Sequence, residues 1–219
     1  MAELTYRFMY ILLVPLIRLY WRISVRGRNN LPKNTGLILA SNHWAGIDPI
    51  MVCSSFWRPV HWLAKVELVI TPRIAWFFRG AAVIPVNRDA PQQVSIEKAA
   101  AVIKRGGLFG IYPEGTRSRD GRLYRGYTGV ARIAHASGAP VVPTAVMGTR
   151  ESAPKGTRLP RPTKVEVRFG KPLRFAMQEG EDEKVAYRRF TDELMRAIQA
   201  LTGQVYVDDY NSRRQPTED

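Results

Sequence analysis

The chain has 219 residues, enough for one domain with a sizeable hydrophobic core. Its 33 lysines and arginines outnumber its 19 acidic residues, and the resulting net charge of +14 favours acidic partners such as nucleic acid, an anionic membrane or an acidic protein. The single cysteine, Cys53, excludes an intrachain disulfide and a cysteine-rich zinc site. Because the aromatic residues stand in apolar runs and no nucleic-acid-binding motif occurs, we expect no nucleic-acid partner.

The first expected element is an amphipathic N-terminal helix that associates with a membrane. Ten uncharged residues, 8–17, lie between Arg7 and Arg18, whereas a membrane-spanning helix needs ~20 apolar residues. On a helix, Arg7, Arg18 and Arg22 would form one basic stripe on an otherwise apolar surface, which is typical of an interfacial anchor. Pro15 would kink this helix or split it. The alternative is a first helix that packs only on the protein core.

Apolar runs and helical patterns alternate along the rest of the chain. The expected strands are 23–26, 37–41, 60–64, 83–86, 108–112, 141–147 and 164–169. The expected helices are 48–56, 71–79, 91–105, 128–137 and 181–201. This alternation predicts a single α/β domain with a largely parallel central sheet flanked by helices. We divide the chain into a membrane-associating segment at 1–24, the folded domain at 25–205 and a polar C-terminal tail at 206–219.

A histidine and an aspartate lie five positions apart just after the predicted strand 37–41, in the stretch Asn42-His43-Trp44-Ala45-Gly46-Ile47-Asp48. A turn of this length can return Asp48 to the imidazole, fix its tautomer and leave the other ring nitrogen basic. No G-x-S-x-G nucleophile elbow occurs, so such a base would act on a hydroxyl of the substrate. A structural His–Asp pair is an alternative. A metal site using His43, Asp48, Glu114 or His61 is another, although no metal-ligand spacing supports it.

A second polar cluster, Pro113-Glu114-Gly115-Thr116-Arg117-Ser118, follows the predicted strand 108–112. The guanidinium of Arg117 is a rigid fork that suits a phosphate, although such a run also fits an ordinary solvated surface. Lys65 and Arg88 each follow a predicted strand, so we expect them at the same sheet edge as His43. Several cations that converge there would form a phosphate site, whereas one alone would only be solvated.

These stretches, together with residues 80–88 and Val141-Val142-Pro143, resemble the glycerolipid acyltransferases of the lysophosphatidic acid acyltransferase type, the 1-acylglycerol-3-phosphate O-acyltransferases. The four family blocks occur in order between Leu37 and Met147, with Tyr112 where the family usually has Phe. The resemblance implies that His43 is the catalytic base and that Asp48 orients it. It also implies a substrate-binding glycerol phosphate site, whose residues are Lys65, Arg88, Glu114, Gly115, Thr116 and Arg117.

The implied reaction moves a fatty acyl group from acyl-CoA or acyl-ACP to 1-acylglycerol 3-phosphate and gives phosphatidic acid for phospholipid biosynthesis. The acyl thioester is a co-substrate, and we expect neither a metal nor another cofactor. The expected partners are a lysophospholipid, the thioester, acyl carrier protein and an anionic membrane. The expected location is the cytoplasmic face of the cell membrane, as a peripheral or monotopic protein. Alternatives are acylation of glycerol 3-phosphate or another lysophospholipid, hydrolysis of the thioester, and non-catalytic lipid binding.

Overall fold

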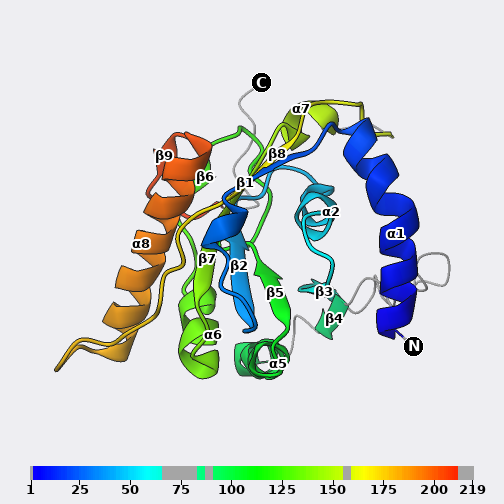
Figure 1. Ribbon diagram of the computed structural model, residues 1–219. Coiled ribbons are helices and arrows are strands. Elements are labelled where there is room, and N and C mark those ends of the chain that lie inside the picture. Colours follow the sequence, from blue (N-terminus) through cyan, green and yellow to red (C-terminus); the bar gives the residue numbers. More distant parts are fainter. Residues whose placement is uncertain (1, 66–82, 87–90, 155–158, 212–219) are drawn as a thin grey trace.

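The computed structural model describes residues 2–65, 83–86, 91–154 and 159–211. They form an α/β domain around a seven-stranded sheet with the order β1-β8-β7-β2-β5-β3-β4 (Figure 1). Neighbouring strands from β7 to β4 all run parallel, whereas β8 is antiparallel to β7 and β1 is parallel to β8. The expected α/β fold with a largely parallel sheet is therefore confirmed.

The main sheet contains strands whose bounds lie close to the predicted ones. They are β1 (Ser24–Arg26), β2 (Leu37–Ser41), β3 (Val60–Lys65), β4 (Val83–Val86), β5 (Leu108–Ile111), β7 (Val141–Met147) and β8 (Glu166–Phe169). The helices are α1 (Ala2–Tyr20), the 3-10 helix η1 (Arg28–Asn30), α2 (Asp48–Cys53), α5 (Gln92–Lys104), α6 (Gly129–Ser137), α7 (Thr149–Ser152) and α8 (Glu183–Thr202). The helix expected at 71–79 lies outside the described residues.

Strand β2 lies in the middle of the sheet and is buried along its whole length. Its alternate side chains enter two hydrophobic cores, one on each face of the sheet. Leu39 packs in the core that includes Met51 of α2, and Ile38 packs in the core that includes Phe190 of α8. A strand that is covered on both faces is expected to be a continuous apolar run, as residues 37–40 are.

Helix α1 packs beside α2 and keeps an apolar face on the surface. Tyr10 donates a hydrogen bond to the carbonyl of Ser54, and its ring lies 4.7 Å from that of Trp57. The helix runs through Pro15 as one element and ends at Tyr20. Arg22 therefore lies in the turn that follows, with φ 43°, and not on the basic stripe that we expected along the helix.

Residues 206–211, the described part of the polar tail expected at 206–219, pack against the domain. Strand β9 (Tyr206–Val207) pairs with β6 (Leu123–Tyr124) in a small parallel sheet next to the main one. The backbone of Arg125 also donates a hydrogen bond to the carbonyl of Asp209. The packed domain thus continues beyond residue 205, and this segment reaches the loop that carries Arg117.

Candidate active site

The carboxyl ends of β2 and β5 lie side by side, since the register pairs Ala40 with Ile111. The chain leaves these ends as two loops, 42–47 and 113–118, which we call the histidine loop and the arginine loop. The backbone N–H of Ser118 donates to the carbonyl of His43 at 2.8 Å and ties one loop to the other. The two polar clusters found in the sequence therefore form one site at the expected edge of the sheet.

Asp48 holds both the histidine loop and the His43 ring. Its Oδ2 atom lies 2.9 Å from Nδ1 of His43 and accepts the backbone N–H groups of Trp44 and Ala45 at 2.7 and 2.8 Å. Because a carboxylate oxygen only accepts hydrogen bonds, Nδ1 carries a proton, and in the neutral imidazole the lone pair is on Nε2. Asp48 is fully buried, whereas the His43 side chain is 16% exposed and can be reached by a substrate.

Glu114 lies beneath both loops. One carboxylate oxygen accepts the backbone N–H of His43 at 3.2 Å, and the other accepts that of Tyr124 at 3.0 Å. The residue has no exposed surface, and this burial raises its pKa from 4.5 to about 7, although the two N–H donors oppose the rise. In this arrangement Glu114 contacts the backbone that carries His43, and a bound phosphate would have to lie elsewhere.

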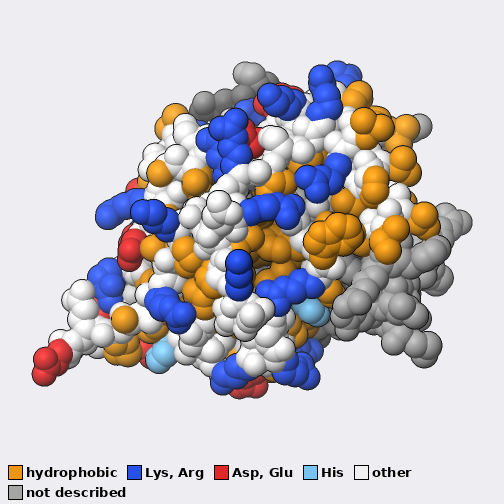
Figure 2. Space-filling view, in the orientation of Figure 1, with side chains coloured by type: hydrophobic (Ala, Val, Ile, Leu, Met, Phe, Trp, Pro, Cys, Tyr) orange, Lys and Arg blue, Asp and Glu red, His pale blue; other side chains and the backbone are white. Residues whose placement is uncertain are grey.

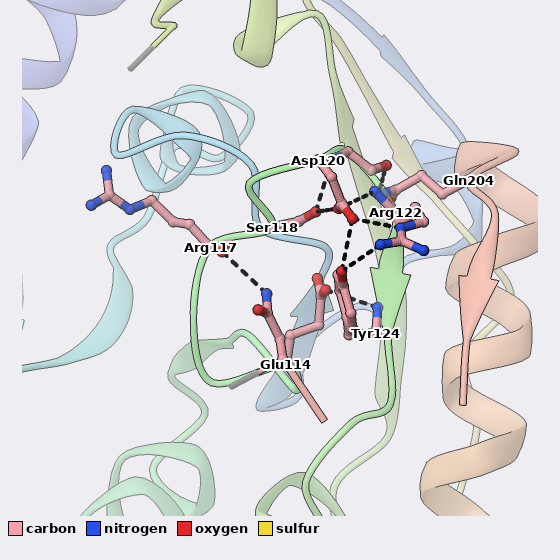
Figure 3. A network of polar contacts seen from close by, with 9 residues as sticks. Glu114, Arg117, Ser118, Asp120, Arg122, Tyr124 and Gln204 are labelled. Atoms are coloured by element: carbon pink, nitrogen blue, oxygen red, sulfur yellow. Dashed lines mark hydrogen bonds and ion pairs between the residues drawn. The ribbon is translucent and has the colours of Figure 1, made fainter. Parts of the chain in front are cut away.

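Arg117 extends from the other end of the arginine loop. A Cβ placed on Gly46 would lie 3.8 Å from Nη1 of Arg117, so the guanidinium lies over the histidine loop. Figure 3 shows this side chain extending away from the cluster around Asp120. Arg117 is exposed and forms no ion pair with any residue that the structure describes. Among the described residues, no carboxylate therefore neutralises the charge of Arg117 next to the histidine loop.

The neighbouring arginine Arg122 is paired instead. It contacts the carboxylate of Asp120, which also accepts hydrogen bonds from Ser118 and the Tyr124 hydroxyl (Figure 3). Although partial burial opposes it, these hydrogen bonds lower the pKa of Asp120 to about 2. Asp120 thus closes the end of the arginine loop.

The structure describes the remaining residues of the expected phosphate site to different extents. Gly115 has φ 69° and donates its N–H to the carbonyl of Tyr112, while Thr116 is partly exposed beside it. Lys65 is the last residue of β3, where its register neighbour is Val86. Arg88 lies outside the described residues. The structure therefore brings Gly115 and Thr116 together with Arg117, and places Lys65 by its backbone at the end of the adjoining strand.

Two further residues support the site, and the sequence reasoning gave them no role there. The side chain of Asn42 exchanges two hydrogen bonds with the backbone of Val146, at 2.9 and 3.0 Å, and so extends the contact between β2 and β7 up to His43. The ring of Tyr112 stacks on the His43 imidazole. An asparagine directly after a buried strand, and an aromatic residue at the end of the adjacent strand, were the available signals.

A metal site does not form from the described residues. No three of their His, Cys, Asp or Glu side chains come together as ligands. His61 lies on β3, where Nδ1 is 3.1 Å from the Leu108 carbonyl, and its burial lowers its pKa.

The fold and the two loops define an α/β protein with an oriented histidine and an exposed arginine at one sheet edge. A family model described as "Acyltransferase" matches residues 22–147, more than half of the chain. The chain therefore belongs to this acyltransferase family, and the resemblance found in its motifs is confirmed.

The fold is similar to that of a solved structure, the 1-acyl-sn-glycerophosphate (LPA) acyltransferase PlsC from Thermotoga maritima, with a TM-score of 0.67. The sequences are 26% identical, and the match covers 86% of this chain and 79% of PlsC.

Curated relatives carry the same kind of name. The chain is 29% identical over 198 residues to the 1-acyl-sn-glycerol-3-phosphate acyltransferase of Bacillus subtilis (strain 168), covering 90% of this chain and 96% of that protein. It is 33% identical over 141 residues to the chloroplastic 1-acyl-sn-glycerol-3-phosphate acyltransferase BAT2 of Brassica napus. The second match covers 63% of this chain and 41% of the relative, so the chain spans about two fifths of the length of that plant protein.

Proposed function

We propose that this chain transfers a fatty acyl group from an acyl thioester, acyl-CoA or acyl-ACP, to the free hydroxyl of 1-acylglycerol 3-phosphate. The product is phosphatidic acid. One observation carries the proposal: the histidine loop holds an imidazole oriented by Asp48, and the exposed guanidinium of Arg117 lies over the same loop. Acyl transfer to an alcohol that bears a phosphate needs one base and one anion clamp within the length of a glycerol unit. The printed names of the relatives agree with this substrate.

In the proposed reaction His43 acts directly on the acceptor. Its Nε2 removes the hydroxyl proton while the oxygen attacks the thioester carbonyl. The tetrahedral intermediate then collapses, the C–S bond breaks, and the imidazolium returns the proton to the leaving thiolate. Asp48 stabilises the imidazolium that forms between the two steps. General base catalysis of this kind contributes about 10²–10⁴-fold. The thioester supplies the activated acyl group, so the reaction as proposed needs neither a metal nor another cofactor.

Arg117 binds the phosphate of the acceptor and thereby places its hydroxyl at His43. A guanidinium can donate two parallel hydrogen bonds to a phosphate, which fixes orientation as well as charge. Gly115 and Thr116 shape the loop that presents Arg117. Lys65 and Arg88 belong to the proposed phosphate site through the family resemblance of their sequence positions. Holding the acceptor in this way lowers the entropic part of the barrier.

Substrate and product are lipids, and we propose that the protein works at the cytoplasmic face of the cell membrane as a peripheral or monotopic protein. None of the described helices is long and apolar enough to cross a bilayer. Helix α1 nevertheless exposes large apolar side chains, and Figure 2 shows apolar atoms gathered on its side of the molecule. The net charge of +14 favours an anionic bilayer and also an acidic carrier protein as the donor.

The decisive experiment is an assay of free thiol released from palmitoyl-CoA by purified protein in detergent. We expect release only when 1-acylglycerol 3-phosphate is added, and loss of that release in His43→Ala. Release without an acceptor would indicate a hydrolase. If neither palmitoyl-CoA nor palmitoyl-ACP reacts with any lysophospholipid or with glycerol 3-phosphate, the proposal is wrong and non-catalytic lipid binding becomes the better interpretation.

A second comparison tests the clamp. Arg117→Ala should raise the KM for 1-acylglycerol 3-phosphate at least tenfold and leave a monoacylglycerol without phosphate nearly unaffected. Arg119→Ala is the matched control, because Arg119 is also exposed but lies two residues further along the chain. An equal loss with both acceptors would argue against a phosphate clamp at Arg117.

A further inference from the structure

Three aromatic rings form a stack that ends on His43. The centroid of the Tyr112 ring lies 3.8 Å from that of the imidazole, with the two planes inclined by only 11°. Trp62 lies 4.8 Å from the Tyr112 ring, at 21°. His43 follows the end of β2, Tyr112 follows the end of β5, and Trp62 lies within β3. These three strands are neighbours in this order. The stack therefore runs across the sheet towards the histidine.

A glycine two residues before Tyr112 makes room for the stack. The register pairs Gly110 of β5 with Trp62 of β3. A Cβ on Gly110 would lie 2.5 Å from the indole, so only glycine lets the indole lie over the strand at this point. Side chains two residues apart on a strand project from the same face, and Tyr112 therefore follows next to the indole. The Tyr112 ring thus packs against the Trp62 indole, which itself occupies the space left by the missing side chain of Gly110.

The hydrogen bond to Asp48 leaves one freedom to the imidazole. It fixes the tautomer and the position of Nδ1, but the ring plane can still tilt around that contact. A ring packed flat against one face of the imidazole removes the tilt and also keeps water from that face. The direction of the Nε2 lone pair depends on this plane, and a displacement of about 1 Å at a reacting atom can cost about 10²-fold in rate.

We propose that Tyr112 is a positioning residue for the acyl transfer, acting through the face of its ring on His43. This inference rests on the proposed function of His43 as the base. The hydroxyl of Tyr112 has no part in it, because that oxygen is buried and has no hydrogen-bond partner among the described residues. Removing an unpartnered buried hydroxyl is close to neutral for stability. Phenylalanine at position 112 should therefore retain the positioning of His43, whereas an aliphatic side chain should lose it.

The kinetic test compares Tyr112→Phe and Tyr112→Leu with a control. Phe109→Leu removes the same amount of aromatic ring from β5, but on the face that packs in the other core, away from His43. We expect Tyr112→Phe to keep kcat within twofold and Tyr112→Leu to lower kcat about 10- to 100-fold with KM changed less than threefold. Phe109→Leu should keep kcat within threefold. Similar losses in Tyr112→Leu and Phe109→Leu, or in Tyr112→Phe and Tyr112→Leu, would overturn the proposal.

A spectroscopic test does not depend on activity. The chain has three histidines, so ¹³C-histidine labelling gives few ring signals, and His43→Ala identifies those of His43. The Tyr112 ring current should shift these signals upfield in the wild type and in Tyr112→Phe, and the shift should disappear in Tyr112→Leu. Unchanged signals in a folded Tyr112→Leu protein would refute the stack. If Tyr112→Leu does not fold, Tyr112→Met carries the same test. If His43→Ala retains activity while the wild type shows the ring-current shift, the proposed function is wrong but the stack of Tyr112 on His43 is still supported.

Discussion

The carboxylate of Glu114 accepts the backbone N–H of His43 from directly beneath the histidine loop, at 3.2 Å. This contact joins the histidine loop to the arginine loop through the main chain of His43. The second carboxylate oxygen of Glu114 accepts the backbone N–H of Tyr124. A single buried carboxylate therefore bridges the histidine loop, the arginine loop and β6. Protonation of Glu114 should therefore change the free energy of unfolding of the protein.

The first prediction concerns the pH dependence of unfolding. Burial raises the pKa of Glu114 from 4.5 to about 7, so between these pH values the folded state holds a proton that the unfolded state has lost. The contribution of Glu114 to stability is thus fully present below pH 4.5 and is lost as the pH rises to about 7. A shift of this size corresponds to about 3 kcal/mol. Denaturant unfolding of the wild type and Glu114→Gln at several pH values should show this slope only in the wild type, and parallel curves would contradict the prediction.

The second prediction separates the charge of Asp48 from its hydrogen bonds. All three donors, the two backbone N–H groups and Nδ1 of His43, meet Oδ2, while Oδ1 is buried without a partner among the described residues. In Asp48→Asn the amide oxygen can occupy the position of Oδ2, so the loop and the tautomer persist while the charge is lost. We expect kcat to fall at least ~10²-fold with little change in KM. The buried amide NH₂ should cost about 1–3 kcal/mol of unfolding free energy. Activity within tenfold of the wild type would mean that the charge of Asp48 does not assist His43.

The third prediction uses the turn before Arg117. Gly115 has φ 69°, and a Cβ there would lie 3.2 Å from the Tyr127 ring. Gly115→Ala should therefore lower the unfolding free energy by about 1–2 kcal/mol and displace Arg117. Gly180 has a similar φ of 71°, but a Cβ would meet nothing within 4 Å. Gly180→Ala is thus a control with the same backbone strain. Only Gly115→Ala should raise the KM for the phosphate-bearing acceptor, and an equal KM in the two variants would show that this turn does not set the position of the clamp.

The sequence predicted the central strands well because their burial is local information. The mainly apolar runs at 37–41, 83–86 and 141–147 form β2, β4 and β7 with the predicted bounds. Strands β6 and β9 were missed because two residues carry no periodicity, and each exists only through its pairing with the other. The burial of Glu114 was also beyond local reasoning. From the sequence, a glutamate between Pro113 and Gly115 is expected to be an exposed turn residue. Its hydrogen-bond partner Tyr124 lies ten positions further along the chain.

The last prediction concerns the apolar face of α1. Leu16 and Leu19 are 64% and 76% exposed, although α1 packs beside α2 through other side chains. Large apolar side chains on the outer face of a helix lose water contact when they enter a bilayer interface, at roughly 25 cal/mol for each Å² buried. The double substitution Leu16→Glu and Leu19→Glu should therefore reduce cosedimentation with vesicles of phosphatidylglycerol and phosphatidylcholine at least tenfold. Val185→Glu on α8 is the control, because Val185 is also exposed, at 58%. Activity on acceptor dispersed in detergent should be unchanged in both proteins. Equal vesicle binding by the α1 variant and the control would show that another surface, or net charge alone, brings the protein to the membrane.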